Sequence, residues 1–172
     1  YGKNDYKIDD NADYVFIHVP RTGGIAFSKI LNIISKEKNI NFKKDAHYSV
    51  SIYHSPLEKN YITIFRNPVL RAISYYQANL RHKTDPYHYL AKKSVSTFFN
   101  HCEAVHNTYC KYFSGYIHSE VDQRIFEIAK NNLKNFKYVL NFDDLDNEII
   151  NFFKKFNCSS SSLSEIPNFG EG

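Results

Sequence analysis

Two arginines, Arg21 and Arg66, stand 45 positions apart, and each lies between a short apolar run and an amphipathic helical pattern. The segments around them read YVFIHVPRTGGIA (14–26) and YITIFRNPVLRAISYY (61–76). A helix N-terminus attracts anions through its free N–H groups and its dipole, and a guanidinium adds a planar charged fork that suits phosphate. The spacing suits a nucleotide-binding α/β unit, so the two segments together predict a ligand with two separated phosphate-like groups.

The TGG turn of the first segment is the predicted anion-binding loop. Thr22, Gly23 and Gly24, with the N–H groups of Ile25 and Ala26, are expected to wrap the anion at the helix N-terminus. Small residues should let the backbone approach, whereas a side chain there would keep the anion out. A lone TGG turn is usually an ordinary turn, but its occurrence in order with the second segment favours binding. The Walker pattern GxxxxGK is absent, which disfavours a kinase-like enzyme that uses a nucleoside triphosphate. The dinucleotide pattern GxGxxG is also absent.

Strands are expected to alternate with helices along the chain, which predicts an α/β fold with a mainly parallel central sheet. Both arginines then fall beyond the carboxyl ends of strands, where ligands bind in such sheets. The expected strands are Tyr14–Val19, Tyr61–Phe65 and Tyr138–Phe142, and the expected helices cover Gly24–Lys36, the segment after Asn67, Ser94–Val105, Ser119 to about Leu133, and the segment from Asp143 on.

The helix after the second arginine has the clearest local signals. Asn67 is a good N-cap, and Pro68 occupies the first helical position, where proline is welcome. An apolar stripe is predicted on one face, with two polar residues opposite: the stripe is Val69, Ile73, Tyr76 and Leu80, and the polar residues are Arg71 and Ser74.

Other parts of the chain carry weaker local signals. Residues 40–58 are ambiguous, with extended pieces around His47–Tyr53, and residues 82–93 read as a polar loop. Ser119 with Asp122 makes a capping box for the helix that follows. Residues 1–13 read as a loose polar lead-in to a single domain of residues 1–172.

Composition excludes several classes of protein. The apolar fraction of 42% and aromatic fraction of 16% support a real core, and the net charge of +4 suits a small polyanion or an acidic glycan. The lysines are scattered rather than gathered in a basic stripe, so no nucleic acid partner is expected. The three cysteines and eight histidines form neither CxxC nor HExxH, so no metal is expected, and no long apolar span predicts a membrane crossing.

PRTGG followed by RNPxxRxxSxY resembles the cofactor-binding motifs of the sulfotransferase superfamily, whose donor is 3′-phosphoadenosine 5′-phosphosulfate (PAPS). The closest likeness is to carbohydrate sulfotransferases, with PKTGG and RDPxxRxxSxY. Two weaker likenesses are NTYCKYFSG and YVLNFDDLDNEIINFF, and together the similarity covers about residues 14–156. The resemblance implies a P-loop-like three-layer fold and transfer of a sulfuryl group from PAPS to a hydroxyl acceptor, a glycan by the closest likeness. The alternative is a non-catalytic module of the same fold that binds a nucleotide or an anionic glycan.

The resemblance also implies roles for individual residues. Arg66 and Ser74 would hold the 3′-phosphate of PAPS or of its product PAP, and Arg21 would stabilise the leaving oxygen. His47 matches the position of the proposed base in glycan 2-O-sulfotransferases, and its ordinary pKa near 6.5 suits proton abstraction. A surface or partly buried structural histidine is the alternative for this residue, with His54 as the reserve base.

The chain departs from the family pattern at the loop. It has arginine where relatives carry lysine at residue 21, and Ile25 and Ala26 where relatives carry hydroxyl residues. Losing two hydroxyls predicts weaker cofactor binding or lowered activity. Relatives continue past the position of Asn168, which suggests a minimal or truncated C-terminal part. Localisation stays open between the cytoplasm, for a bacterial or viral protein, and the Golgi lumen, for a trimmed eukaryotic one.

Overall fold

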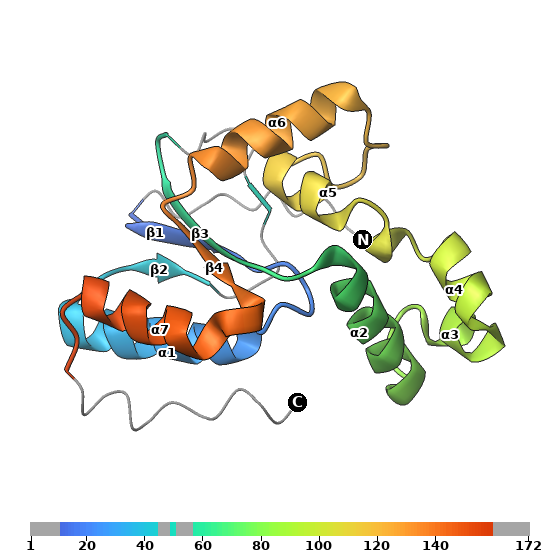
Figure 1. Ribbon diagram of the computed structural model, residues 1–172, viewed down its shortest axis with the longest axis horizontal. Helices are drawn as coiled ribbons and strands as arrows, with labels where there is room; N and C mark the ends of the chain where they lie inside the picture. The colour runs from blue at the N-terminus through green and yellow to red at the C-terminus, as the bar shows by residue number, and fades with distance from the viewer. Residues whose placement is uncertain (1–10, 45–48, 51–56, 160–172) are drawn as a thin grey trace.

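A parallel four-stranded sheet forms the centre of the part of the chain that the computed structural model describes, residues 11–44, 49–50 and 57–159 (Figure 1). The strands are β1 (Tyr14–Ile17), β2 (Phe42–Lys43), β3 (Asn60–Phe65) and β4 (Tyr138–Asn141). They lie in the order β2-β1-β3-β4, so β1 and β3 are the central pair. Their apolar runs are buried, as expected for parallel strands that are covered on both faces.

Seven α-helices and two 3₁₀ turns connect the strands of the described chain. They are α1 (Gly24–Lys38), α2 (Pro68–Arg81), α3 (His88–Lys93), α4 (Val95–His101), η1 (Glu103–Val105), α5 (Thr108–Ser114), α6 (Gln123–Lys134), η2 (Phe142–Asp144) and α7 (Leu145–Lys155).

The helices form layers on both faces of the sheet. α1 and α7 lie side by side on one face, and α5 and α6 cover the other (Figure 1). Phe27 and Phe152 pack in the core on the first face, and Phe113 and Phe136 pack in the core on the second. The expectation of a three-layer α/β fold with a parallel central sheet is therefore confirmed.

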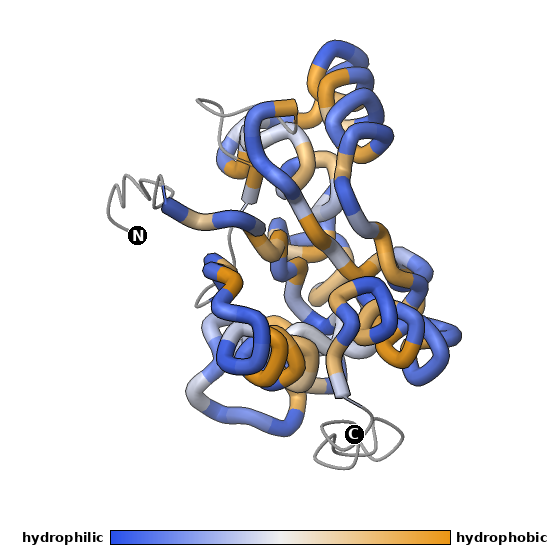
Figure 2. Tube along the Cα trace, turned by 90° about the vertical axis from the view of Figure 1, so that its left-hand side faces the viewer, coloured by the Kyte–Doolittle hydropathy of each residue, from blue (hydrophilic) through white to orange (hydrophobic). Residues whose placement is uncertain are grey.

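Helices α2, α3 and α4 extend away from the sheet, past the end of β3 (Figure 1). They enclose a smaller core around Leu90, Phe98 and Cys102, with Tyr76 packed against it. The ring of Tyr76 meets that of Phe98 edge-on, with the centroids 5.2 Å apart. Along the helices, hydrophobic and hydrophilic residues alternate, as expected for elements that bury one face (Figure 2).

The predicted polar loop at residues 82–93 is wrong over its second half, because α3 occupies His88–Lys93. Contacts with α2 hold this short helix: the side-chain oxygen of Asn79 accepts from the Tyr87 N–H at 3.2 Å, and the Asn79 carbonyl lies 2.7 Å from Nδ1 of His88. Ala91 and Leu90 are buried on its inner face. Six residues have little helical tendency alone, so tertiary contacts decide this element.

The predicted faces of α2 are also wrong. Val69, Ile73 and Leu80 of the expected apolar stripe are exposed, whereas Arg71 is only 1% exposed. The Nη2 of Arg71 donates to Oγ1 of Thr108 at 2.7 Å, so this helix turns a polar residue toward α5. Hydrophobic periodicity identified the helix correctly but not the side that the neighbouring helices cover.

The structure corrects two smaller predictions and places a strand in a stretch that the sequence left ambiguous. The N-cap of α6 is Asp122, whose Oδ1 accepts from the Ile125 N–H at 2.8 Å, so the capping box beginning at Ser119 does not form. The helix expected over Ser94–Val105 breaks at Cys102 into α4 and η1. Strand β2 lies within the stretch that the sequence left ambiguous.

Candidate anion-binding site

The two arginines of the sequence motifs follow the two central strands. From β1 the chain turns through α1 to β2 on one side, and β3 leads on to β4 on the other, so the strand order reverses between β1 and β3. In open parallel sheets, ligands bind beyond the carboxyl ends of the strands at such a reversal. Arg21 follows β1 and Arg66 follows β3 directly, so both lie at this place.

The loop after β1 holds a strained backbone. Arg21 has φ 69° and Gly23 has φ 77°, both in the left-handed region. A residue with a side chain in this region costs about 1–3 kcal/mol and persists only where its surroundings hold it. Here Nη1 of Arg66 donates to the carbonyl of Arg21 at 3.1 Å, and the Thr22 hydroxyl donates to the Val19 carbonyl at 2.7 Å. The second motif therefore helps to maintain the conformation of the first.

Among the described residues, the N-terminus of α1 is open, because no side chain caps it. Gly23 is its N-cap and provides no side-chain hydrogen bond, and the first turn holds no acidic residue. The first intrahelical bond to this cap runs from the Phe27 N–H to the Gly23 carbonyl, which leaves the N–H groups of Gly24, Ile25 and Ala26 without a helical partner. These three main-chain N–H groups are the donors that the predicted loop would offer an anion.

The side chains of the loop differ from the expectation. The hydroxyl of Thr22 is fully buried and turned inward, so it does not face a ligand at the loop. Ile25 is 76% exposed on the first turn. An anion at this loop would therefore meet main-chain N–H groups and guanidinium groups rather than hydroxyls.

The packing around the loop requires a glycine at both positions. A Cβ at Gly24 would point into the ring of His18, and a Cβ at Gly23 would lie 3.2 Å from both Leu145 and Phe142, in addition to the strain of its positive φ. Both glycines therefore let α1 start close to the end of β1 and to α7. That a side chain at these positions would also obstruct an anion stays a prediction.

The N-terminus of α2 is not open in the same way. The side chain of Asn67 accepts from the N–H groups of Val69 and Leu70 at 3.0 and 3.1 Å, as its N-cap role predicted. What this second motif offers an anion is the Arg66 side chain, whose guanidinium carbon lies 4.2 Å above the centre of the Phe142 ring.

Arg21, Arg66 and Ser74 are brought together across the two motifs. The Nε of Arg21 donates to the Ser74 hydroxyl at 3.1 Å. Among the described residues, neither arginine has a carboxylate within ion-pair distance. Partial burial lowers the pKa of Arg21, and the positive charges of Arg81 and Arg66 lower it further, against an opposing effect of Asp85. Such a group of cations with few counter-charges favours an anionic ligand.

The predicted base cannot be placed against this group. His47 and the reserve His54 lie outside the described residues. His18 is 8% exposed and stacks on Phe16 with ring centroids 5.5 Å apart, which is the packing of a structural histidine. Glu58 is exposed.

Sequence reasoning missed two aromatic residues that support the site. Phe142 lies under the Arg66 guanidinium, and the Tyr109 hydroxyl bonds to the main chain of Arg66. Both belong to the segments with weak family likeness, NTYCKYFSG and YVLNFDDL, so that likeness was the available signal. Neither residue has a local pattern that points to an arginine more than 40 positions away.

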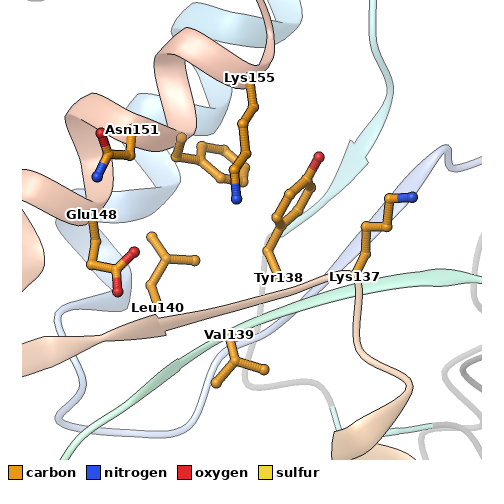
Figure 3. Close-up of a pocket in the computed structure, with 8 residues that line it drawn as sticks. Lys137, Tyr138, Val139, Leu140, Glu148, Asn151 and Lys155 are labelled. Carbon is orange, nitrogen blue, oxygen red and sulfur yellow. The ribbon is translucent and has the colours of Figure 1, made fainter.

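A separate polar cavity of about 120 Å³ lies between β4 and α7 (Figure 3). Its lining includes Lys137, Glu148 and Lys155, and the Lys155 ammonium lies 4.9 Å from the centre of the Tyr138 ring. None of the predicted site residues that the structure describes lines it. The predicted site and this cavity are therefore distinct features.

Two further observations concern the described residues alone. They contain no group of three or more His, Cys, Asp or Glu side chains arranged to hold a metal ion. None of their helices has both the length and the apolar character needed to cross a bilayer.

No protein-family model, curated protein or solved structure matches this chain.

Proposed function

We propose that this chain is a sulfotransferase that moves a sulfuryl group from PAPS to a hydroxyl, with a carbohydrate as the acceptor. One observation carries the proposal. Residues from two separated motifs, Arg21, Arg66 and Ser74, meet beyond the carboxyl ends of β1 and β3 and are joined by hydrogen bonds of 3.1 Å. The order of motifs, their resemblance and their meeting point all favour a nucleotide with phosphate groups at both ends of its ribose.

Each residue has a role in this proposal. The free N–H groups at the start of α1 bind the 5′-phosphosulfate, and Arg21 stabilises the charge that grows on the leaving phosphate oxygen. Arg66 and Ser74 bind the 3′-phosphate. The acceptor oxygen bonds to sulfur as the bond from sulfur to the 5′-phosphate oxygen breaks, and the hydroxyl proton passes to a base, for which His47 is the candidate.

A non-catalytic module of the same fold is the second candidate. The inward-turned hydroxyl of Thr22 and the exposed side chain of Ile25 favour it, because the loop then offers the transferring group no hydroxyl donor. Such a protein would bind the nucleotide or an anionic glycan without transfer.

Thermal-shift titration tests the ligand class. Adenosine 3′,5′-bisphosphate at about 100 times its dissociation constant should add about 2.7 kcal/mol to the free energy of unfolding. Adenosine 5′-phosphate should stabilise the protein less at equal concentration, and ATP with Mg²⁺ should not stabilise it more than the bisphosphate. A preference for ATP with Mg²⁺ would end the proposal.

The role of Arg66 is tested by calorimetry. Arg66→Ala should weaken binding of adenosine 3′,5′-bisphosphate at least about tenfold, the scale of one lost charged hydrogen bond, and remove most of the preference over adenosine 5′-phosphate. Arg124→Ala is the matched control, because Arg124 lies on α6 with its guanidinium 5.6 Å from the Tyr116 ring. An Arg66→Ala variant that keeps the preference would show that the second motif has been misassigned.

Transfer of radiolabelled sulfate from PAPS across a panel of glycan and small hydroxyl acceptors separates the two candidates. A labelled product supports the enzyme. Bisphosphate binding without transfer to any acceptor favours the binding module.

A further inference from the structure

The hydroxyl of Tyr109 binds both main-chain polar groups of Arg66. It accepts a hydrogen bond from the Arg66 N–H at 3.0 Å and donates one to the Arg66 carbonyl at 2.7 Å. Arg66 lies between the last residue of β3 and the N-cap of α2. The hydrogen bonds of the strand end and those of the helix begin at this residue. The Tyr109 side chain from α5 therefore bonds the main-chain N–H and carbonyl of Arg66 in place of strand or helix partners.

The Tyr109 ring is itself held firmly. It stacks on Phe65 with centroids 4.6 Å apart and planes 25° apart, and it packs against Phe113 at 5.5 Å. The guanidinium of the buried Arg71 lies 5.9 Å from the ring centre and also donates to Oγ1 of Thr108, the residue before Tyr109. Burial raises the pKa of Tyr109, so its hydroxyl stays protonated and able to donate.

A continuous set of contacts then runs from α5 to the loop after β1. Tyr109 holds the main chain of Arg66, the Arg66 guanidinium lies over Phe142, and its Nη1 bonds to the carbonyl of Arg21. Because a displaced main chain at residue 66 would move the guanidinium with it, the position of the Tyr109 hydroxyl limits where Arg66 can present its charge.

We infer that Tyr109 is a positioning residue for the nucleotide site: its hydroxyl presets Arg66 for the 3′-phosphate. This inference rests on the proposed function. Tyr109 contacts no nucleotide group itself and acts only through Arg66. Its effect should therefore appear in the discrimination between nucleotides with and without a 3′-phosphate.

The test compares two tyrosine variants of the same helix by calorimetry. Tyr109→Phe keeps the ring and removes only the hydroxyl. Its ratio of affinities for adenosine 3′,5′-bisphosphate over adenosine 5′-phosphate should fall about tenfold, with binding of the monophosphate changed less than about twofold. Tyr112→Phe is the control, because the Tyr112 hydroxyl makes no hydrogen bond within the described residues, and its ratio should equal that of the wild type.

A second comparison separates positioning from general destabilisation. In an Arg66→Ala background, Tyr109→Phe should leave the affinity ratio unchanged, whereas a merely structural role would lower stability in both backgrounds without moving the ratio in either. If Tyr109→Phe does not fold, Phe65→Leu takes its place in the test, because it removes the ring on which Tyr109 stacks. The affinity ratio should then also fall, by a smaller factor.

Three results would overturn the inference. A wild-type ratio in Tyr109→Phe, or in Phe65→Leu if that variant has to be used, shows that the hydroxyl does not preset Arg66. An equal fall with and without Arg66 shows that it acts by another route. If the wild-type protein shows no preference for the bisphosphate, the proposed function is wrong, and the inference fails with it. This result is obtained before any variant is made.

Discussion

A single methyl group at residue 24 tests the packing explanation of the binding loop. The Cβ of Gly24→Ala would lie 2.6 Å from Cγ of His18 and closer still to two other ring atoms. Contacting carbon atoms ordinarily lie about 3.5–4.0 Å apart, so the imidazole must retreat by about 1 Å or more. The ring is 8% exposed and stacks on Phe16, which leaves little room for that movement.

Overpacking of this kind costs about 1–3 kcal/mol. For a chain of this size each kcal/mol lowers the Tm by about 2–4 °C, so Gly24→Ala should melt about 2–12 °C below the wild type. Urea unfolding monitored by circular dichroism gives the change in the free energy of unfolding directly.

The matched comparison is the same change in a His18→Ala background. His18→Ala removes the obstructing ring, so Gly24→Ala should there cost much less than in the wild type, and the difference is the coupling energy of the pair. An equal cost in both backgrounds would refute the contact with His18. A variant that is as stable as the wild type but binds adenosine 3′,5′-bisphosphate poorly would show instead that this glycine serves anion access.

Two other predictions concern titratable groups. Burial raises the pKa of Cys102 to about 11 from 9.0, so the folded state favours the neutral thiol. The contribution of the neutral Cys102 thiol to stability should be complete below pH 9 and lost as the pH rises from 9 to 11. Urea midpoints across this range should fall less steeply in Cys102→Ala than in the wild type, and parallel curves would contradict the assignment. For His47, a general base predicts that His47→Ala lowers the rate of sulfate transfer by about 10²–10⁴ while nucleotide affinity stays nearly unchanged. Near-normal turnover of this variant would place the base elsewhere.

Local chemistry made several elements predictable. The apolar runs that became β1 and β3 are continuous rather than alternating, which is the pattern of strands that are covered on both faces, whereas in β4 Val139 is exposed and Leu140 is buried. Asn67 followed by Pro68 predicted the start of α2, and the cap bonds to Val69 and Leu70 confirm it. These signals involve residues within a few positions of each other, so they can be recognised without the fold.

Elements that depend on distant partners were predicted less well. The short helix α3 is held by Asn79 of α2 and by burial against Phe98, and nothing within its own six residues demands a helix. The apolar stripe of α2 predicted the wrong buried face. The face that carries Arg71 is buried instead, because Arg71 donates a hydrogen bond to Thr108, 37 positions along the chain.

The sequence by itself predicted which residues could bind phosphate groups and that each of the two motifs begins with a buried strand. Only the tertiary structure decided how they meet: β1 and β3 become neighbours, Arg66 bonds to the carbonyl of Arg21, and Arg21 reaches Ser74. It also decided that the Thr22 hydroxyl turns inward and that Tyr109 holds Arg66. The physical reason is range: caps, turns and strand runs act over a few residues, whereas these hydrogen bonds exist only after the sheet and its covering helices have packed.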